Sequence, residues 1–135
     1  MDRSGPQVIV VDTNVLADAL LGVSGVRERA FRLLRETDEI VVPDLFFAEF
    51  ANVVWQYVTR ARLPLARGLE ILDDAEALVT RSVPATSLWH RAVEMAVDRR
   101  HPVYDTLFVA LAEAERTKLV TRDARLRERY PELVQ

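Results

Sequence analysis

Near the N-terminus the sequence reads Val8-Ile9-Val10-Val11-Asp12-Thr13-Asn14. Four consecutive β-branched apolar residues predict a short strand that is buried on both faces, as in a parallel sheet. The strand ends at an acidic residue. Thr13 and Asn14 are side chains suited to cap a helix that continues to about Leu21. A buried strand that leads directly into a helix is typical of an α/β fold.

Strand and helix patterns alternate along the rest of the chain. Further strands are predicted at residues 39–43, 81–84, 119–121 and 133–134, and further helices at 26–35, 44–59, 65–79, 86–99, 106–114 and 124–129. Ser24 is expected to cap the helix at 26–35, and Thr86 or Ser87 the helix that ends at Arg99. The alternation predicts an α/β sandwich around a central, mostly parallel sheet, within a single domain that spans residues 1–135.

The composition is that of an ordinary globular protein. Of the 135 residues, 50% are hydrophobic and 29% are charged. No apolar stretch approaches the roughly 18 residues that span a bilayer, and the N-terminus lacks the layout of a secretion signal. The absence of cysteine excludes disulfides and thiolate metal sites. These features predict a cytoplasmic protein with no membrane partner. The net charge of −3 argues against bulk electrostatic binding of nucleic acid, although a local Arg cluster can still contact phosphates.

Four acidic residues lie where predicted strands end or predicted helices begin: Asp12, Glu49, Asp105 and Asp123. Ligand sites of open parallel sheets form beyond the carboxyl ends of the strands, which is where Asp12 and Asp123 are expected. Asp105 is expected at a helix start, where the macrodipole favours an anion. Carboxylates that converge repel one another unless they bind Mg²⁺ or Mn²⁺, hard cations that prefer oxygen ligands. The four acids therefore predict a metal-dependent site able to hydrolyse phosphodiesters.

Each acid also has a simpler explanation when it is considered alone. Asp12, Asp105 and Asp123 are all ordinary candidates for helix N-caps. Glu49 is harder to explain in this way, because it lies beside Phe46 and Phe50 on an apolar helix, and a buried acid needs a partner. The prediction of a metal site rests on the four acids together.

A resemblance to a known family becomes specific at the segments that carry these acids. The chain resembles the PIN-domain ribonucleases of the VapC toxin type over nearly its whole length, with the PIN-like three-layer α/β/α sandwich that this implies. The matching segments are Val10-Val11-Asp12-Thr13-Asn14-Val15-Leu16, Pro43-Asp44-Leu45-Phe46-Phe47-Ala48-Glu49, Tyr104-Asp105-Thr106-Leu107-Phe108-Val109-Ala110-Leu111-Ala112 and Leu119-Val120-Thr121-Arg122-Asp123.

The resemblance implies an endoribonuclease that cleaves RNA with Mg²⁺ or Mn²⁺ and leaves a 3′-hydroxyl and a 5′-phosphate. It implies Asp12, Asp105 and Asp123 as the principal metal ligands. Glu49 would bind the metal directly or through water, or would help to deprotonate the attacking water. It further implies that the Thr121 hydroxyl orients the metal shell and that Asn14 supports the neighbouring acids.

Two basic residues lie close to the acids in the sequence. Arg122 and Arg125 are candidates for contacts with RNA phosphates, and solvated surface explains them equally well. The implied mechanism requires neither His90 nor His101.

Proteins of the VapC type usually dimerise and are inhibited by a cognate antitoxin, so the resemblance implies a homodimer and an antitoxin partner. Apolar residues on helices would suit such contacts, among them Phe31, Leu34, Phe46, Phe47 and Trp55. Core packing explains each of these residues individually.

Three other classes of protein place acids or phosphates above a parallel sheet. A receiver-type phosphoacceptor domain would need paired acids after the first strand and a late Lys, whereas Lys118 precedes the last strong strand. A phosphatase of the haloacid dehalogenase type would need Asp at the position of Asn14, and a dinucleotide-binding domain a glycine-rich turn. A PIN domain without catalytic activity, kept for protein binding, is the remaining alternative.

Overall fold

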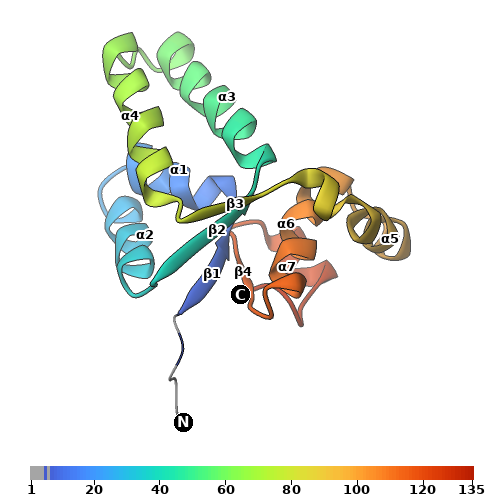
Figure 1. Cartoon of the computed structure of the whole chain (residues 1–135). Coiled ribbons are helices and arrows are strands. Elements are labelled where there is room, and N and C mark those ends of the chain that lie inside the picture. Colours follow the sequence, from blue (N-terminus) through green and yellow to red (C-terminus); the bar gives the residue numbers. More distant parts are fainter. Residues whose placement is uncertain (1–4, 6) are drawn as a thin grey trace.

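The computed structural model describes residue 5 and residues 7–135 (Figure 1). At its centre lies a four-stranded sheet with the strand order β3-β2-β1-β4, in which every neighbouring pair is parallel. The strands are β1 (Val8–Val11), β2 (Glu39–Pro43), β3 (Arg81–Val83) and β4 (Leu119–Val120). The predicted parallel sheet is therefore confirmed, and β1 and β4 are neighbours although they lie near opposite ends of the chain.

Helices cover both faces of this sheet, which confirms the three-layer α/β/α sandwich (Figure 1). On one side lie α1 (Thr13–Leu21), α2 (Val26–Arg35), α3 (Leu45–Arg60) and α4 (Leu65–Leu78). On the other side lie α5 (Trp89–Arg99), α6 (Val103–Ala114) and α7 (Ala124–Arg129). The hairpin of α3 and α4 extends past the edge of the sheet (Figure 1).

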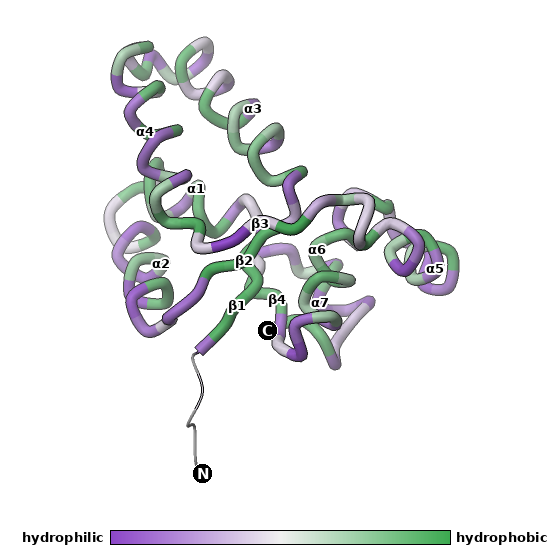
Figure 2. The backbone as a smooth tube through the Cα atoms, in the orientation of Figure 1, coloured by the Kyte–Doolittle hydropathy of each residue, from purple (hydrophilic) through white to green (hydrophobic). Residues whose placement is uncertain are grey.

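The core forms where apolar strands meet the most apolar helix. Val10 and Val11 of β1 are fully buried, as expected for a strand covered by helices on both faces. The run from Thr106 to Ala112 in α6 is buried around its whole circumference, because this helix is itself covered by α5 and by the sheet. Figure 2 shows the contrast between the hydrophobic central strands and the mainly hydrophilic α2.

Two predicted helix caps were wrong. Gly25, not Ser24, is the N-cap of α2, and its φ of 92° is a conformation that glycine adopts without steric cost. The segment predicted to begin a helix at Thr86 or Ser87 instead forms the 3₁₀ turn η1 (Ala85–Ser87), and α5 begins only at Trp89. In both places, a short polar side chain could have capped the helix, but the backbone turns into the helix at a later residue, so that the N-caps are Gly25 and Leu88.

Two further boundaries differ from the expected ones. Helix α6 begins at Val103, so Asp105 lies within its first turn and is not its cap. The predicted edge strand at 133–134 is reduced to a single parallel bridge between Leu119 and Val134. This bridge nevertheless attaches the C-terminal segment to the outer edge of β4.

Two of the apolar residues named as possible partner contacts are internal. Leu34 and Phe46 are 5% and 0% exposed, so their side chains pack inside this chain. Phe47 and Trp55 remain exposed on α3. Within the described part of the chain, no helix has the length and apolar character needed to cross a membrane.

Candidate functional site

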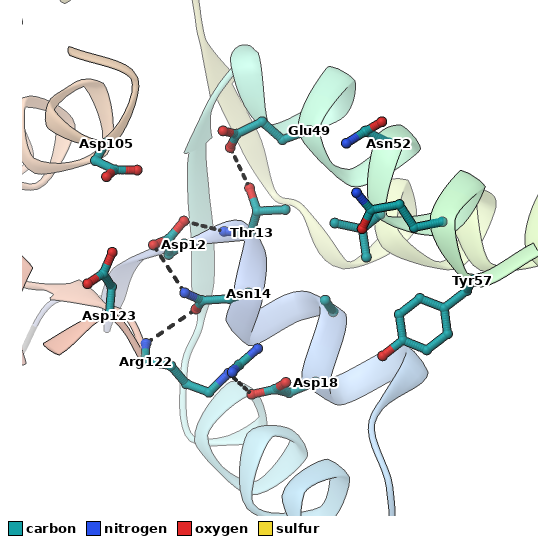
Figure 3. A pocket seen from close by; sticks show the side chains of 13 residues that line it. Asp12, Thr13, Asn14, Asp18, Glu49, Asn52, Tyr57, Asp105, Arg122 and Asp123 are labelled. Carbon is teal, nitrogen blue, oxygen red and sulfur yellow. Dashed lines mark hydrogen bonds and ion pairs between the residues drawn. The ribbon is translucent and has the colours of Figure 1, made fainter. Parts of the chain in front are cut away.

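A pocket of about 420 Å³ opens at the carboxyl ends of β1 and β4, between α1 and α3 (Figure 3). The four predicted acids all line it, although they come from four separate segments of the chain. The complete lining is Asp12, Thr13, Asn14, Ala17, Asp18, Glu49, Asn52, Val53, Gln56, Tyr57, Asp105, Arg122 and Asp123. The topology explains this convergence, since parallel neighbours end at the same edge of a sheet.

Asp12 is the most deeply buried of these acids, with 9% of its surface exposed. It directly follows β1 and is the N-cap of α1, where its Oδ1 accepts a hydrogen bond of 2.7 Å from the Thr13 backbone N–H. Its Oδ2 accepts a hydrogen bond of 2.7 Å from the Thr121 hydroxyl. Both carboxylate oxygens therefore have fixed partners, which orients the group before any ligand binds.

The Thr121 hydroxyl connects three residues of the site. Besides donating to Asp12, its oxygen accepts hydrogen bonds from the Asp123 backbone N–H at 3.0 Å and from the Asn14 side-chain amide at 3.3 Å. Asn14 in turn accepts a hydrogen bond from the backbone N–H of Arg122. Residues from the ends of β1 and β4 are thus joined by one connected set of hydrogen bonds.

Glu49 approaches the pocket from the opposite wall. It lies on α3, and its carboxylate accepts a hydrogen bond of 2.8 Å from the hydroxyl of Thr13 on α1. Asp12 and Glu49 are therefore held by the backbone N–H and by the side chain of the same residue. Thr13 was predicted only as a helix cap, a position that Asp12 takes, and its hydroxyl instead links the two walls of the pocket.

Asp105 and Asp123 both lie near helix N-termini. Asp123 caps α7 and accepts a hydrogen bond of 2.9 Å from the Arg125 backbone N–H. Asp105, in the first turn of α6, lies 2.9 Å from Nε2 of His101. His101 is 8% exposed, and its ring packs edge-on against the fully buried ring of Tyr130. The imidazole is therefore a rigid support for the Asp105 carboxylate.

The two arginines beside the acids are placed differently. Arg122 lines the pocket, and its guanidinium forms an ion pair of 2.7 Å with Asp18 of α1. Arg125 is not among the lining residues, and its side chain is 83% exposed, 4.0 Å from Asp123. Of the two predicted phosphate contacts, only Arg122 thus lies at the pocket itself.

The acids influence each other through burial and mutual repulsion. Burial raises the pKa of Asp12, the hydrogen bonds from Thr121 and Thr13 oppose this rise, and the charges of Asp105 and Asp123 add to it. Burial also raises the pKa of Glu49, opposed by the Thr13 hydroxyl and reinforced by Asp12 and Asp105. Negative charge in this pocket is consequently unfavourable unless a cation compensates it.

The donor set fits a hard divalent cation. Carboxylate oxygens are the ligands that Mg²⁺ and Mn²⁺ prefer. Among the described residues that line the pocket, Arg122 is the one cationic side chain, and Asp18 already pairs with it. No three Asp, Glu or His side chains in the described part of the chain are spaced as a ready metal-ligand group. The carboxylates that a cation could meet in this pocket are those of Asp12, Glu49, Asp105 and Asp123.

The raised pKa of Glu49 leads to a prediction about stability. A carboxyl that binds its proton more tightly in the folded state makes folding less favourable as pH rises above its ordinary value of 4.5. Glu49→Gln removes this cost and keeps an oxygen for the Thr13 hydroxyl. In chelator-treated protein, we expect the variant to gain about 1 kcal/mol in free energy of unfolding at neutral pH.

Urea denaturation near pH 7 and near pH 4 measures this gain. The gain in free energy of unfolding should be smaller at the lower pH, because the wild-type Glu49 then carries a proton. Glu70→Gln serves as the matched control, since Glu70 is an exposed residue outside the pocket on α4. An equal gain at both pH values would show that the charge of Glu49 is not the cause.

Three contacts at the site were not anticipated from the sequence: Thr13 with Glu49, His101 with Asp105, and Asp18 with Arg122. The spacing of His101 and Asp105, four residues apart, was the one available signal, because such residues share a helix face. The intervening Pro102 masked it by predicting a break. The other two pairs join segments whose proximity only the folded chain reveals.

Comparison with known proteins agrees with this geometry. The sequence model of the PIN domain family matches residues 9–130. Ribonuclease VapC3 of Pyrobaculum aerophilum is 32% identical over 130 residues, covering 93% of this chain and 97% of the relative. Ribonuclease VapC9 of Mycobacterium tuberculosis is 33% identical over 119 residues, covering 88% of each chain.

Among solved structures, the chain resembles one in the crystal structure of VapBC2 from Rickettsia felis, which is bound to a DNA fragment from the VapBC2 promoter. The TM-score is 0.66 at 17% identity, and the match covers 95% of this chain and 96% of the other. At this identity the likeness concerns the fold. The family match and the curated relatives carry the assignment further: the chain belongs to the PIN-domain family, among its VapC-type ribonucleases.

Proposed function

We propose that this protein is a Mg²⁺- or Mn²⁺-dependent endoribonuclease and the toxin of a VapBC-type toxin–antitoxin system. The observation that carries the proposal is the convergence of Asp12, Glu49, Asp105 and Asp123 on one pocket from four separate segments. The chain's membership in the VapC-type ribonucleases supports it. We also propose that residues 1–135 form one PIN domain, which the family match over residues 9–130 supports.

The acids divide into two groups by their position. Asp12, Asp105 and Asp123 would hold the cation, and Thr121, Asn14 and His101 would orient them. A bound divalent cation supplies activation of water and stabilisation of the leaving oxygen in phosphodiester hydrolysis. Glu49 stands on the other wall, where its raised pKa suits acceptance of a proton from the attacking water. Binding of the cation by Glu49, directly or through water, is the second role open to it.

Partners follow from the same assignment. RNA is the proposed substrate, and Arg122 can offer its guanidinium to a phosphate if Asp18 releases it. A cognate antitoxin is the proposed protein partner, in line with the structural likeness to a VapBC protein. We further propose a homodimer that acts in the cytoplasm.

Cleavage of RNA by purified, antitoxin-free protein tests the function directly. With Mn²⁺ we expect endonucleolytic cuts in a mixed RNA pool that leave a 5′-phosphate, and we expect chelation to abolish them. Asp105→Asn should cut far more slowly, since it removes one carboxylate charge while keeping the side-chain shape. A wild type that leaves every RNA intact, or an equally active Asp105→Asn protein, would reject the nuclease in favour of a non-catalytic PIN module.

The contact between His101 and Asp105 leads to a further prediction. His101→Ala should lower the cleavage rate by about tenfold, the effect expected when the support of a metal-binding carboxylate is removed. His101→Gln should recover much of this loss, because its amide can reach the carboxylate in place of Nε2. His90→Ala is the control, since His90 is exposed on α5 outside the acidic pocket. Steady-state kinetics on one RNA would make the comparison, and equal rates for all three variants would contradict a positioning role.

A further inference from the structure

The acidic pocket continues away from the metal-binding acids along one face of α3. The lining residues on this helix are Glu49, Asn52, Val53, Gln56 and Tyr57. Their spacing of three, four, seven and eight residues places them on one helical stripe. With a rise of 1.5 Å per residue, Tyr57 lies about 12 Å along the helix axis from Glu49. Figure 3 shows Tyr57 at the end of the pocket farthest from Asp105.

The chemistry of this stripe changes beyond Glu49. Asn52 and Gln56 are neutral amides one helical turn apart, and their side chains have no hydrogen-bond partner among the described residues. Each amide offers both donors and an acceptor to a ligand. Tyr57 adds an aromatic ring with 36% of its surface exposed. We refer to Asn52, Gln56 and Tyr57 as the α3 wing of the pocket.

Charge separates the two ends of the pocket. The inner end carries Asp12, Glu49, Asp105 and Asp123, whereas the α3 wing carries no charged side chain of its own. The two other charged lining residues, Asp18 and Arg122, form an ion pair with each other. A nucleotide has a matching division, because its phosphate needs cations while its base is a flat, neutral group with hydrogen-bonding edges. Proteins bind unpaired bases by stacking on aromatic rings and by hydrogen bonds to the base edges.

From this arrangement we infer that the α3 wing is a nucleobase subsite, which binds an unpaired base next to the scissile phosphate. Asn52 and Gln56 would bond to the edge of the base, and the Tyr57 ring would stack on its face. This inference rests on the proposed ribonuclease function and adds to it a determinant of RNA sequence preference. It also predicts that the substrate is single-stranded at the cut, since only an unpaired base can enter the wing.

The test compares wild type with variants of the α3 wing. Each protein cleaves a random-sequence RNA pool in the presence of Mn²⁺, and the new 5′ ends are sequenced. Wild type should show a base preference at a position beside the cut. Asn52→Ala combined with Gln56→Ala should weaken the preference at that position by about tenfold. Tyr57→Ala should raise KM on a short single-stranded RNA by about tenfold with a smaller change in kcat, and Tyr57→Phe should behave as wild type.

Trp55→Ala is the matched control for the aromatic ring. Trp55 lies on the same helix with 54% of its surface exposed, but it does not line the pocket. Its substitution should leave both base preference and KM unchanged. Circular dichroism checks that each variant keeps its helices.

The outcomes separate the subsite from the nuclease activity itself. An inactive wild type rejects the ribonuclease function, and the subsite with it. An active wild type whose preference and KM do not change in the wing variants rejects the subsite alone. Wing variants that cut RNA normally but lose affinity for the cognate antitoxin would assign the wing to a protein segment and would also overturn the inference.

Discussion

Asp12→Asn should lower the rate of RNA cleavage by about 10³-fold, equivalent to about 4 kcal/mol of transition-state stabilisation. Asp12 is the acid with the most fixed partners, and its carboxylate lies among the charges of Asp105 and Asp123. The amide keeps one oxygen for the Thr13 N–H, and Asn is as good an N-cap as Asp. The lower cleavage rate should therefore result from the missing negative charge at the metal site and not from a disrupted fold.

A stability measurement without RNA distinguishes these two causes. Without metal, Asp12→Asn should melt at or above the wild-type temperature, because it removes a buried negative charge. Mn²⁺ at about 100 times its dissociation constant should stabilise wild type by about 2.7 kcal/mol. The variant should gain far less. A variant that melts well below wild type without metal would mean that lost folding, not lost metal binding, explains its inactivity.

Thr121→Val should lower cleavage by 10- to 100-fold, approximately the effect of removing a group that orients metal ligands. Val keeps the shape of Thr but lacks the hydroxyl that bonds to Asp12, Asn14 and the Asp123 N–H. The side chain is 4% exposed, so the partners left behind cannot easily turn to water. We expect a loss of about 1–3 kcal/mol in free energy of unfolding as well. Thr121→Ser keeps the hydroxyl and should retain most of the activity.

Thr117→Val provides the control for lost stability. The Thr117 hydroxyl bonds to the Val8 carbonyl at 2.8 Å, at the opposite end of β1 from the pocket. This substitution also removes a partly buried hydrogen bond made by a threonine hydroxyl, and it should lower the free energy of unfolding by about 1 kcal/mol. Its cleavage rate below the melting temperature should equal that of wild type. If both Val variants lose activity in proportion to their stability, the Thr121 hydroxyl has no special role at the site.

The two central strands of the sheet could be predicted from the sequence because they are short and mainly apolar, whereas β3 reads Arg-Ser-Val and is largely exposed. The mainly apolar composition of Val8–Val11 and Glu39–Pro43 is typical of strands covered by helices on both faces. The helices between these two strands favour a parallel arrangement. The errors lie at helix starts. Ser24 and Thr86 are good caps by residue type, but the φ of Gly25 and the turn at Ala85–Ser87 set the actual boundaries.

Asp12, Asp105 and Asp123 could be placed at one edge because each follows a strand or lies at a helix start on a known side of a parallel sheet. Glu49 could be placed there because its helix follows β2. The supporting contacts of these acids could not be predicted. The pairing of His101 with Asp105 depends on where α6 begins, two residues before Asp105, and on the ring of Tyr130 behind it. The pairing of Thr13 with Glu49 depends on the distance between α1 and α3, which packing sets. The periodicity of the sequence predicts neither the first residue of α6 nor the distance between α1 and α3.

The hydrogen bond between Asp12 and Thr121 has a consequence for synthesis on the ribosome. Its partners are 109 residues apart, and β1 acquires its neighbour β4 only after Leu119 and Val120 have been translated. Proteins emerge N-terminus first, so a nascent chain carries Asp12 for most of its synthesis without the residues that complete the pocket. Translation that stops before Leu119 therefore yields fragments that lack both Thr121 and Asp123 of the pocket.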